Sequence, residues 1–338
     1  MSIPEIDNMI KTIDQLIKDG ASNSASRLFS DTVWNLVRRP FKLSEDIKFL
    51  VHYTSVEVLF SILSCPVHSN TFFQLSANGP SENLDEDSGF LRMYDTFHSN
   101  DPNEGQFFIN SSPKSGRFKS QHNILWELLQ NRSKLPAYIA SFRGVSKVED
   151  VDDLIFWRTY GKEGKGCAIV FPVSFFSSNT QVLQVRYGKK SVWSTLKHLS
   201  DIFDALSSAP SLRQHNLLYT TSNVPKYISS SLSPITYLHK ANDYKFEKEV
   251  RVVVPYVDLS PKLLFCHRIH DSESGVKLRH FAHLPDLHIR NILRTHSIVL
   301  LGPTVLSKPN LQFVLERRLA RLGLVGAKVC ASKIDYRS

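Results

Sequence analysis

The sequence predicts an α+β fold, in which strands and helices are mixed along the chain. Residues 6–37 carry a helical apolar period, and short β-rich runs begin at residue 49. Strands and helices then follow one another without regular βαβ alternation. The sequence contains no GxGxxG or GxxxxGK[ST] motif, which disfavours the common dinucleotide-binding and P-loop folds.

Two helices are expected at the N-terminal end. Apolar residues recur at steps of three and four over residues 6–17, and Gly20 follows as a stop signal. A second apolar series over residues 25–37 ends before Pro40, which cannot continue a helix. We interpret residues 1–45 as an N-terminal helical cap and residues 46–338 as the main domain.

A strand is expected over residues 49–53, because aromatic and β-branched residues gather there, and Thr54-Ser55 supplies an N-cap for the next helix. Other strands are expected over 90–94, 137–142, 167–171, 181–187, 247–254, 296–301 and 325–331. Other helices are expected over 120–133, 154–160, 191–206 and 309–322. Turns or loops are expected over 77–89, 99–105, 161–166 and 207–234.

Composition limits the class of protein. The four cysteines form no CxxC pair, which argues against a disulfide scaffold or a cysteine-rich zinc site. The N-terminal residues lack a signal-peptide pattern, and the apolar runs are too short for a membrane span, so we expect a cytoplasmic protein without a membrane anchor. A net charge of +9 over 338 residues is mild and scattered, so solvated surface charge explains it better than a nucleic-acid stripe.

Four segments carry side chains that suit chemistry, and each also has an ordinary structural explanation. In a strand, Glu247, Glu249 and Arg251 share one face, which predicts either a polar cleft or a solvated edge with salt bridges. Tyr160 offers a ring for a flat heteroaromatic group or for core packing, and its glycine neighbours permit close backbone approach. The other two segments are His52-Tyr53-Thr54, at a strand end, and Asn100-Asp101, in a turn cluster.

The histidines raise the question of a metal site. His267 and His270 are three residues apart, as are His280 and His283, and His288 follows. This spacing suits two ligands on one helical face, but the surrounding residues define no helix and no HExxH motif is present. We therefore expect no metal. A metal-dependent hydrolase built on these histidines stays the weakest of three functional hypotheses.

Five short motifs in this order resemble a bacterial family known as domain of unknown function 2971. They are His52-Tyr53-Thr54, Asn100-Asp101-Pro102-Asn103-Glu104, Trp157-Arg158-Thr159-Tyr160-Gly161, Phe246-Glu247-Lys248-Glu249-Val250-Arg251 and Leu301-Gly302-Pro303. The resemblance extends over about residues 49–335. The layout is also similar to that of the ADP-ribosyltransferase superfamily, including DNA-modifying toxins of the DarT type, although no Ser-Thr-Ser strand precedes the acid pair. This resemblance implies a split, mixed or antiparallel β-sheet core with flanking helices.

The resemblance implies roles for particular residues. His52, with Tyr53 and Thr54 beside it, is expected to hold the adenosine-side ribose of NAD, and Glu249 or Glu247 the nicotinamide ribose. Tyr160 is the expected partner of the nicotinamide ring, with Tyr94 and Tyr53 as alternatives. Asn100 and Asp101 are expected to border the nicotinamide pocket, and Arg251 to complete the site. His52 and Glu249 must then face one cleft.

The main functional hypothesis is an enzyme that consumes NAD as its substrate. It transfers ADP-ribose to a nucleic acid or a protein, or hydrolyses NAD, as a bacterial toxin or an anti-phage defence effector. The alternative is a catalytically inactive module of a defence system that binds nucleic acid or protein. The sequence does not choose among these acceptors and leaves the oligomeric state open.

Overall fold

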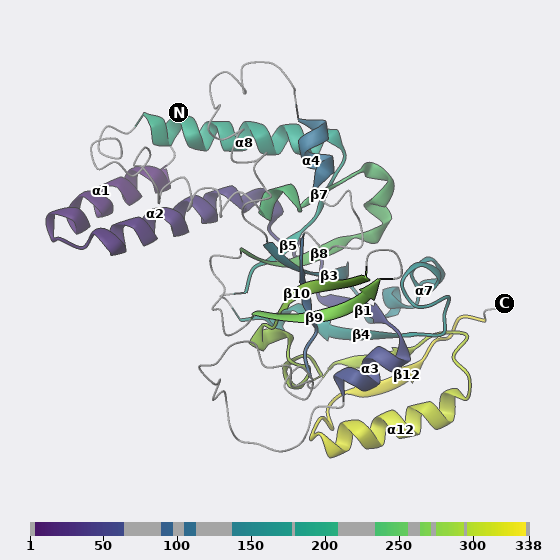
Figure 1. Ribbon diagram of the computed structural model, residues 1–338. Coiled ribbons are helices and arrows are strands. Elements are labelled where there is room, and N and C mark those ends of the chain that lie inside the picture. Colours follow the sequence, from purple (N-terminus) through teal and green to yellow (C-terminus); the bar gives the residue numbers. More distant parts are fainter. Residues whose placement is uncertain are drawn as a thin grey trace.

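The computed structural model describes residues 4–63, 89–96, 105–112, 137–177, 180–208, 234–255, 264–271, 275–293 and 296–335. It has an α+β architecture, with a mixed and mostly antiparallel sheet between layers of helices, as the sequence predicts (Figure 1). Among the helices described, none combines the length and apolar character needed to cross a bilayer.

Most of the α-helices lie close to their expected positions, whereas α4 and α11 were not expected. They are α1 (Pro4–Lys18), α2 (Ser22–Val37), α3 (Val56–Ile62), α4 (Gln106–Ser111), α7 (Leu154–Thr159), α8 (Lys189–Ser207), α11 (Ile289–Ile292) and α12 (Lys308–Arg321). Short 3₁₀ helices are η1 (Arg39–Phe41), η3 (Val148–Val151), η4 (Val173–Phe175), η5 (Asn242–Glu247) and η8 (Pro285–Leu287). The Ser55 side chain caps α3 by accepting a hydrogen bond from the Val58 N–H. Gly20, in a left-handed conformation with φ +75°, follows the end of α1.

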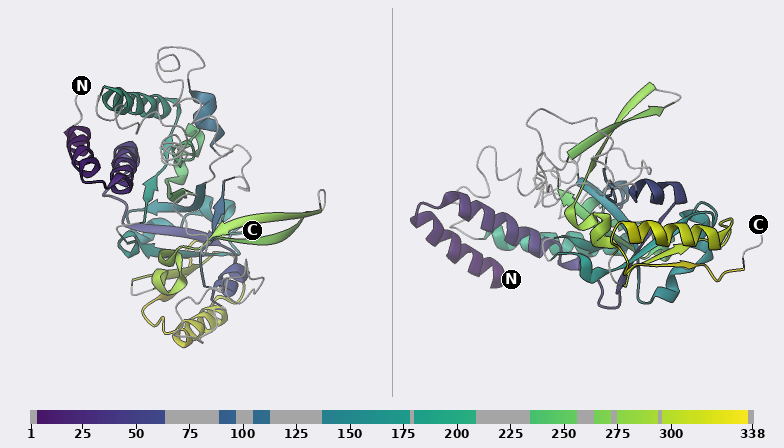
Figure 2. Two further views of the ribbon diagram at one scale, coloured as in Figure 1. Left: turned by 60° about the vertical axis from the view of Figure 1, so that its left-hand side comes forward. Right: turned by 90° about the horizontal axis from the view of Figure 1, so that it is seen from below.

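The strands are β1 (Phe49–Thr54), β2 (Met93–Asp95), β3 (Ala137–Val145), β4 (Cys167–Pro172), β5 (Val182–Gln184), β6 (Arg186–Tyr187), β7 (His239–Lys240), β8 (Glu249–Pro255), β9 (Leu264–Asp271), β10 (Gly275–Ala282), β11 (Ile298–Leu301) and β12 (Lys328–Ala331). The main sheet runs β12-β11-β4-β1-β3-β2-β10-β9, and β8 joins β3 to β5. The β9–β10 hairpin extends away from the body of the molecule (Figure 2).

The sheet divides along β3. Residues 143–145 of β3 pair with β1, residues 138–139 pair with β2, and residues 137–143 pair with β8 on the opposite edge. Beyond Val51, β1 therefore continues against β4 alone. This division makes the sheet a split one around β3.

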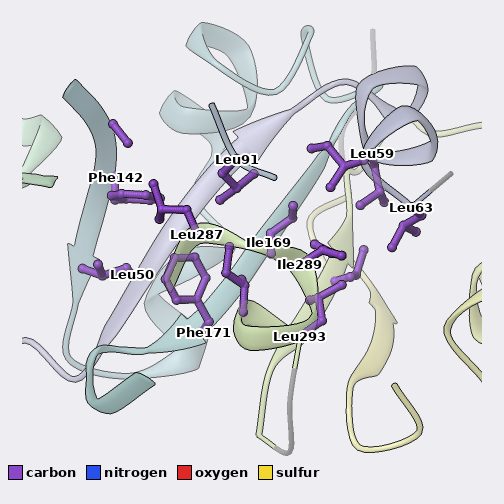
Figure 3. Close-up of a cluster of buried hydrophobic side chains, with 14 of the residues drawn as sticks. Leu50, Leu59, Leu63, Leu91, Phe142, Ile169, Phe171, Leu287, Ile289 and Leu293 are labelled. Atoms are coloured by element: carbon purple, nitrogen blue, oxygen red, sulfur yellow. The ribbon is translucent and has the colours of Figure 1, made fainter. Parts of the chain in front are cut away.

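Three buried clusters cover the sheet. One packs α1, α2 and α8 against the part of the sheet formed by β3, β5 and β8. It includes Ile13, Phe29, Leu199 and Val253. The second packs α3, α11 and α12 on one face, and Figure 3 shows part of it around Phe142 and Phe171. The third lies on the other face, where Trp157 of α7 contacts Val51 and Val170.

Candidate functional site

A network of buried and half-buried polar side chains surrounds the start of β8. We call it the acid cluster, and it consists of Tyr160, Tyr187, Lys240, Glu247, Glu249 and Arg251. β8 is no solvated edge strand, because β3 and β5 flank it on both sides. The exposed fractions of Glu247 and Glu249 are 5% and 6%, so both carboxylates are inside the protein.

Arg251 and Glu249 form a bidentate ion pair within β8. The Arg251 Nε and Nη2 atoms lie 2.7 and 3.1 Å from the two carboxylate oxygens of Glu249. The Arg251 Nη1 atom donates to the carbonyl of Tyr237. The pair joins residues i and i+2 of one strand, which share a face of the sheet, as the sequence predicts for these two positions.

Lys240 of β7 brings the two acids together. Its Nζ atom lies 2.9 Å from Glu247 Oε2 and 2.8 Å from Glu249 Oε2. The hydroxyl of Tyr160 donates to the other oxygen of Glu247, and the backbone N–H of Glu249 donates to the Tyr187 hydroxyl oxygen at 2.8 Å. Lys240 and Tyr187 are members of the site that our sequence analysis missed.

For the charged groups Glu249 and Lys240, interactions with neighbouring charges outweigh the effect of burial on the pKa. Burial would raise the pKa of Glu249, but the neighbouring Arg251 and Lys240 cations outweigh it and lower that pKa to about 2. Burial would lower the pKa of Lys240, and Glu249 instead raises it. Burial, with Glu247 adding to it for Tyr160, raises the pKa of the Tyr160 and Tyr187 hydroxyls, so both rings stay protonated.

The chain reaches Glu249 by a route that differs from the expected strand over 247–254. Residues 242–247 form η5, and Lys248 adopts a left-handed conformation with φ +46° before β8 begins at Glu249. Glu247 therefore does not share a strand face with Glu249 and Arg251. Its carboxylate meets that of Glu249 only because both contact Lys240.

Exposed rings border the acid cluster. Tyr160, Tyr244 and Phe246 have exposed fractions of 43%, 47% and 43%. The buried ring of Phe156 lies 5.9 Å from the Tyr160 ring and 6.0 Å from the Phe246 ring, measured between centroids. Tyr160 thus has an accessible ring face while its hydroxyl contacts the buried acid.

His52 lies on the other side of the sheet, so the expected shared cleft with Glu249 is wrong. Glu249 stands opposite Arg143, which stands opposite Val51, and residues opposite each other share a face. His52 follows Val51 and points the other way. It stands opposite Ile169, its ring contacts Phe142, and burial lowers its pKa to about 4.

Tyr53, by alternation, lies on the face of Glu249, and Thr54 lies on the face of His52. The Tyr53 hydroxyl donates to the Val151 carbonyl at 2.6 Å and accepts from Arg143 at 3.3 Å. These contacts belong to a neighbouring network in which Arg143 also pairs with Asp153 at 3.0 Å. Neither Tyr53 nor Thr54 is a member of the acid cluster.

Other sequence-predicted positions have different outcomes. Asn100 and Asp101 lie outside the described residues, as do the expected loop over 77–89 and the helix over 120–133. Tyr94 lies in β2 opposite Ile139 of β3. The glycines beside Tyr160 serve packing, because the Gly302 N–H donates to Gly166 O and a Cβ at Gly166 would overlap the Thr54 carbonyl.

The histidine pattern falls largely on side chains that are not described, namely His267, His270 and His280. His283 and His288 both contact the Phe90 ring, and His288 caps α11 by accepting the Arg290 N–H. Across the described ranges, no group of three His, Cys, Asp or Glu side chains is arranged to hold a metal ion.

Comparison with family models identifies one part of the chain. Residues 156–252 match the family described as protein of unknown function (DUF2971). The matched stretch contains every member of the acid cluster. The match confirms the predicted resemblance to this family for residues 156–252. The match is narrower than the expected residues 49–335. No curated protein and no solved structure matched the chain.

Proposed function

We propose that the acid cluster is the active site of an enzyme that consumes NAD by an ADP-ribosyltransferase-like reaction, without the His52 contact that the superfamily layout requires and the strand register excludes. The observation that carries the proposal is the meeting of two buried carboxylates, Glu247 and Glu249, at Lys240, beside the exposed ring of Tyr160. In the DUF2971 stretch, this is where acids and an accessible aromatic face lie together. A toxin or defence role would follow from the same resemblance.

The two acids would have different tasks. Glu249 has both oxygens engaged by Arg251 and Lys240, so its task is to hold Lys240 in place and set the charge of the site. One oxygen of Glu247 accepts a hydrogen bond from the hydroxyl of Tyr160, a residue whose side chain is partly exposed. A ribose hydroxyl entering beside Tyr160 can replace that donor, which makes Glu247 the acid that contacts the substrate.

The reaction breaks the bond between the nicotinamide nitrogen and C1′ of the ribose. The bonding electrons leave with nicotinamide, which becomes neutral, and positive charge develops on the ribose. The carboxylate of Glu247 stabilises that charge, and the ring of Tyr160 packs against nicotinamide. An acceptor on nucleic acid or protein, or water, then bonds to C1′ and loses its proton.

Nicotinamide release from NAD tests this proposal. Glu247→Gln keeps the shape of the side chain and removes its charge, and the loss of such a transition-state contact lowers the rate by about 10²–10³. Asp243→Asn is the matched control, since Asp243 is an exposed acid of the same 3₁₀ helix. Equal rates for wild type and Glu247→Gln, or no NAD turnover with any acceptor, would contradict the proposal.

A second function is favoured by the position of His52. If the adenosine-side ribose contact is absent from the face of the acid cluster, the fold can serve as a binding module without chemistry. Calorimetry then detects no NAD binding to the wild-type protein, while a macromolecular partner still binds. Heat released on NAD addition and lost in Glu247→Gln argues for the enzyme instead.

A further inference from the structure

The outward face of α8 carries cations around an exposed tryptophan. Lys189, Lys190, Trp193 and Lys197 are all exposed, and at 100° per residue they fall within one third of the helix circumference. Trp193 has an exposed fraction of 60%, and its indole N–H donates to the Ser111 carbonyl at 3.1 Å. That hydrogen bond fixes the indole while leaving most of its surface accessible.

The charges of α8 are distributed against the stability of the helix. Lys189 and Lys190 occupy its first turn, which the helix dipole makes positive, and the exposed Asp201 and Asp204 occupy its second half. The opposite distribution would stabilise the helix by a few tenths of a kcal/mol per charge. The lysines thus concentrate positive potential at the end of α8 nearest to the acid cluster.

More rings and cations adjoin this end of α8. The Gly188 N–H donates to Lys240 O at 2.9 Å, and the side chain of Asn242, the first residue of η5, lies beside Gly188. η5 and the residue after it contribute Tyr244, Lys245, Phe246 and Lys248, all exposed. We call this set, with Lys189, Lys190, Trp193 and Lys197, the basic–aromatic surface.

We propose that the basic–aromatic surface binds single-stranded nucleic acid. Lysines neutralise backbone phosphates, and exposed rings stack on unpaired bases, so a polyanion with accessible bases uses both kinds of side chain. A duplex keeps its bases stacked internally and leaves the rings without a role. An anionic membrane surface needs a broad apolar face, and the apolar face of α8 is buried against α1 and α2.

This partner assignment rests on charge and exposed rings, and it needs no NAD chemistry. Because the surface borders the acid cluster, it also deepens the proposed function, since a strand bound there would present its bases or phosphates to Glu247 and Tyr160. That second step rests on the proposed function. Binding measured without NAD therefore separates a failure of the surface from a failure of the enzyme.

Fluorescence anisotropy with labelled single-stranded DNA and RNA 15-mers, in the absence of NAD, tests the proposal. Wild-type protein binds with an affinity that falls as salt rises. The variant Lys189→Gln/Lys190→Gln/Lys197→Gln lowers the log–log salt slope by about 2, at about 0.7 per phosphate contact. Trp193→Leu removes the flat ring and weakens binding about tenfold.

A matched control comes from α12, where Arg317 lies over the exposed ring of Phe313, and from Lys328 at the start of β12. Arg317→Gln/Arg321→Gln/Lys328→Gln removes the same charge from another exposed region and leaves binding unchanged. Equal losses in both triple variants mean diffuse charge binding and overturn the proposal. So does the absence of binding, or equal or tighter binding of a DNA duplex or of anionic phosphatidylserine vesicles.

Folding effects are separated by a spectroscopic readout. Trp193→Phe keeps a ring at this position, so thermal unfolding and most of the affinity are retained. Quenching of tryptophan fluorescence by the unlabelled strand is then lost, because the stacked indole is gone. Quenching of the same size in Trp193→Phe shows that bases do not stack on residue 193 and overturns the proposal.

Discussion

Arg251 is buried and fully engaged, with an exposed fraction of 1% and hydrogen bonds to Glu249 and the Tyr237 carbonyl. Replacing one partner of such a pair leaves a buried charge with less compensation. We expect Arg251→Met to lower the free energy of unfolding by about 3–5 kcal/mol, measured by urea denaturation. Arg39→Gln, which breaks an exposed pair with Glu5, serves as the control and lowers the free energy of unfolding much less.

Equal small losses in Arg251→Met and Arg39→Gln would show that water reaches the Glu249 carboxylate freely. The double variant Glu249→Leu/Arg251→Met removes both charges at once. Because no buried charge is then left unpaired, it recovers part of the stability lost in Arg251→Met. This comparison separates the cost of a lone charge from the net contribution of the pair.

Several of the described histidines make stability depend on pH, among them the half-buried His288, whose pKa burial also lowers. Burial lowers the pKa of His52 to about 4 and those of His239 and His283 to about 3, against 6.5 for an unperturbed ring. The unfolded chain binds more protons below pH 6.5, so stability is fully present above that pH and is lost as the pH falls towards 4. Each ring contributes up to about 1.4 kcal/mol per pH unit there.

Urea denaturation at pH 7.5, 6.0 and 5.0 measures this slope. His239 packs between Phe41 and Phe108 and shares a hydrogen bond of 3.1 Å with Ser191. His239→Asn cannot titrate in this range, so the slope should decrease even if the variant is less stable at every pH. An unchanged slope would contradict the assignment of the proton uptake to this ring.

Glu249 affects stability only at lower pH, because its pKa is already near 2.

At the scale of elements, the glycine turn after α7 locks two segments together. The N–H groups of Gly302 and Thr304 donate to Gly166 O and Gly164 O at 2.9 and 3.0 Å. A Cβ at Gly302 would overlap the Gly164 carbonyl, whereas a Cβ at Gly323 meets nothing within 4 Å. Gly302→Ala should therefore lower the melting temperature more than Gly323→Ala, which bears only the strain of φ +74°.

A drop in melting temperature for Gly302→Ala no larger than that for Gly323→Ala would show that this contact yields without cost. The same contact gives the Leu301-Gly302-Pro303 motif and the glycines after Tyr160 a common structural role. The glycines permit the backbone segments 164–166 and 302–304 to approach closely, so their positions reflect packing and not ligand binding.

Elements with local signals were predictable, and those set by tertiary contacts were not. The apolar period over 6–17 and the cap at Ser55 gave their helices to within a few residues. The expected strand over 181–187 is divided at Val185, because β5 pairs with β8 and β6 with β7. The 3₁₀ turn before Glu249 depends on a left-handed Lys248, which sequence propensity disfavours.

At the scale of the molecule, the acid cluster was partly predictable. The shared face of Glu249 and Arg251 follows from strand alternation. Tyr160 was expected as the aromatic of the site, but its contact with Glu247 was not. Lys240 has no such signal, since it lies in a two-residue strand that pairs with β6 among the strands the structure describes. His52 shows the converse, because a motif suggested a shared cleft while the strand register placed it on the other face.

The packing of α1 and α2 in one buried cluster with α8 leads to a prediction about removing the N-terminal helices. α1 and α2 bury apolar residues against α8, including Phe29, Leu36 and Leu199, and each large side chain kept from water contributes about 1.5–3 kcal/mol. A chain starting at residue 46 exposes the apolar face of α8. We expect it to aggregate, measured by size-exclusion chromatography and dye binding, while Glu5→Gln in the full chain stays monodisperse. A soluble, cooperatively unfolding fragment would instead identify residues 1–45 as a separable cap.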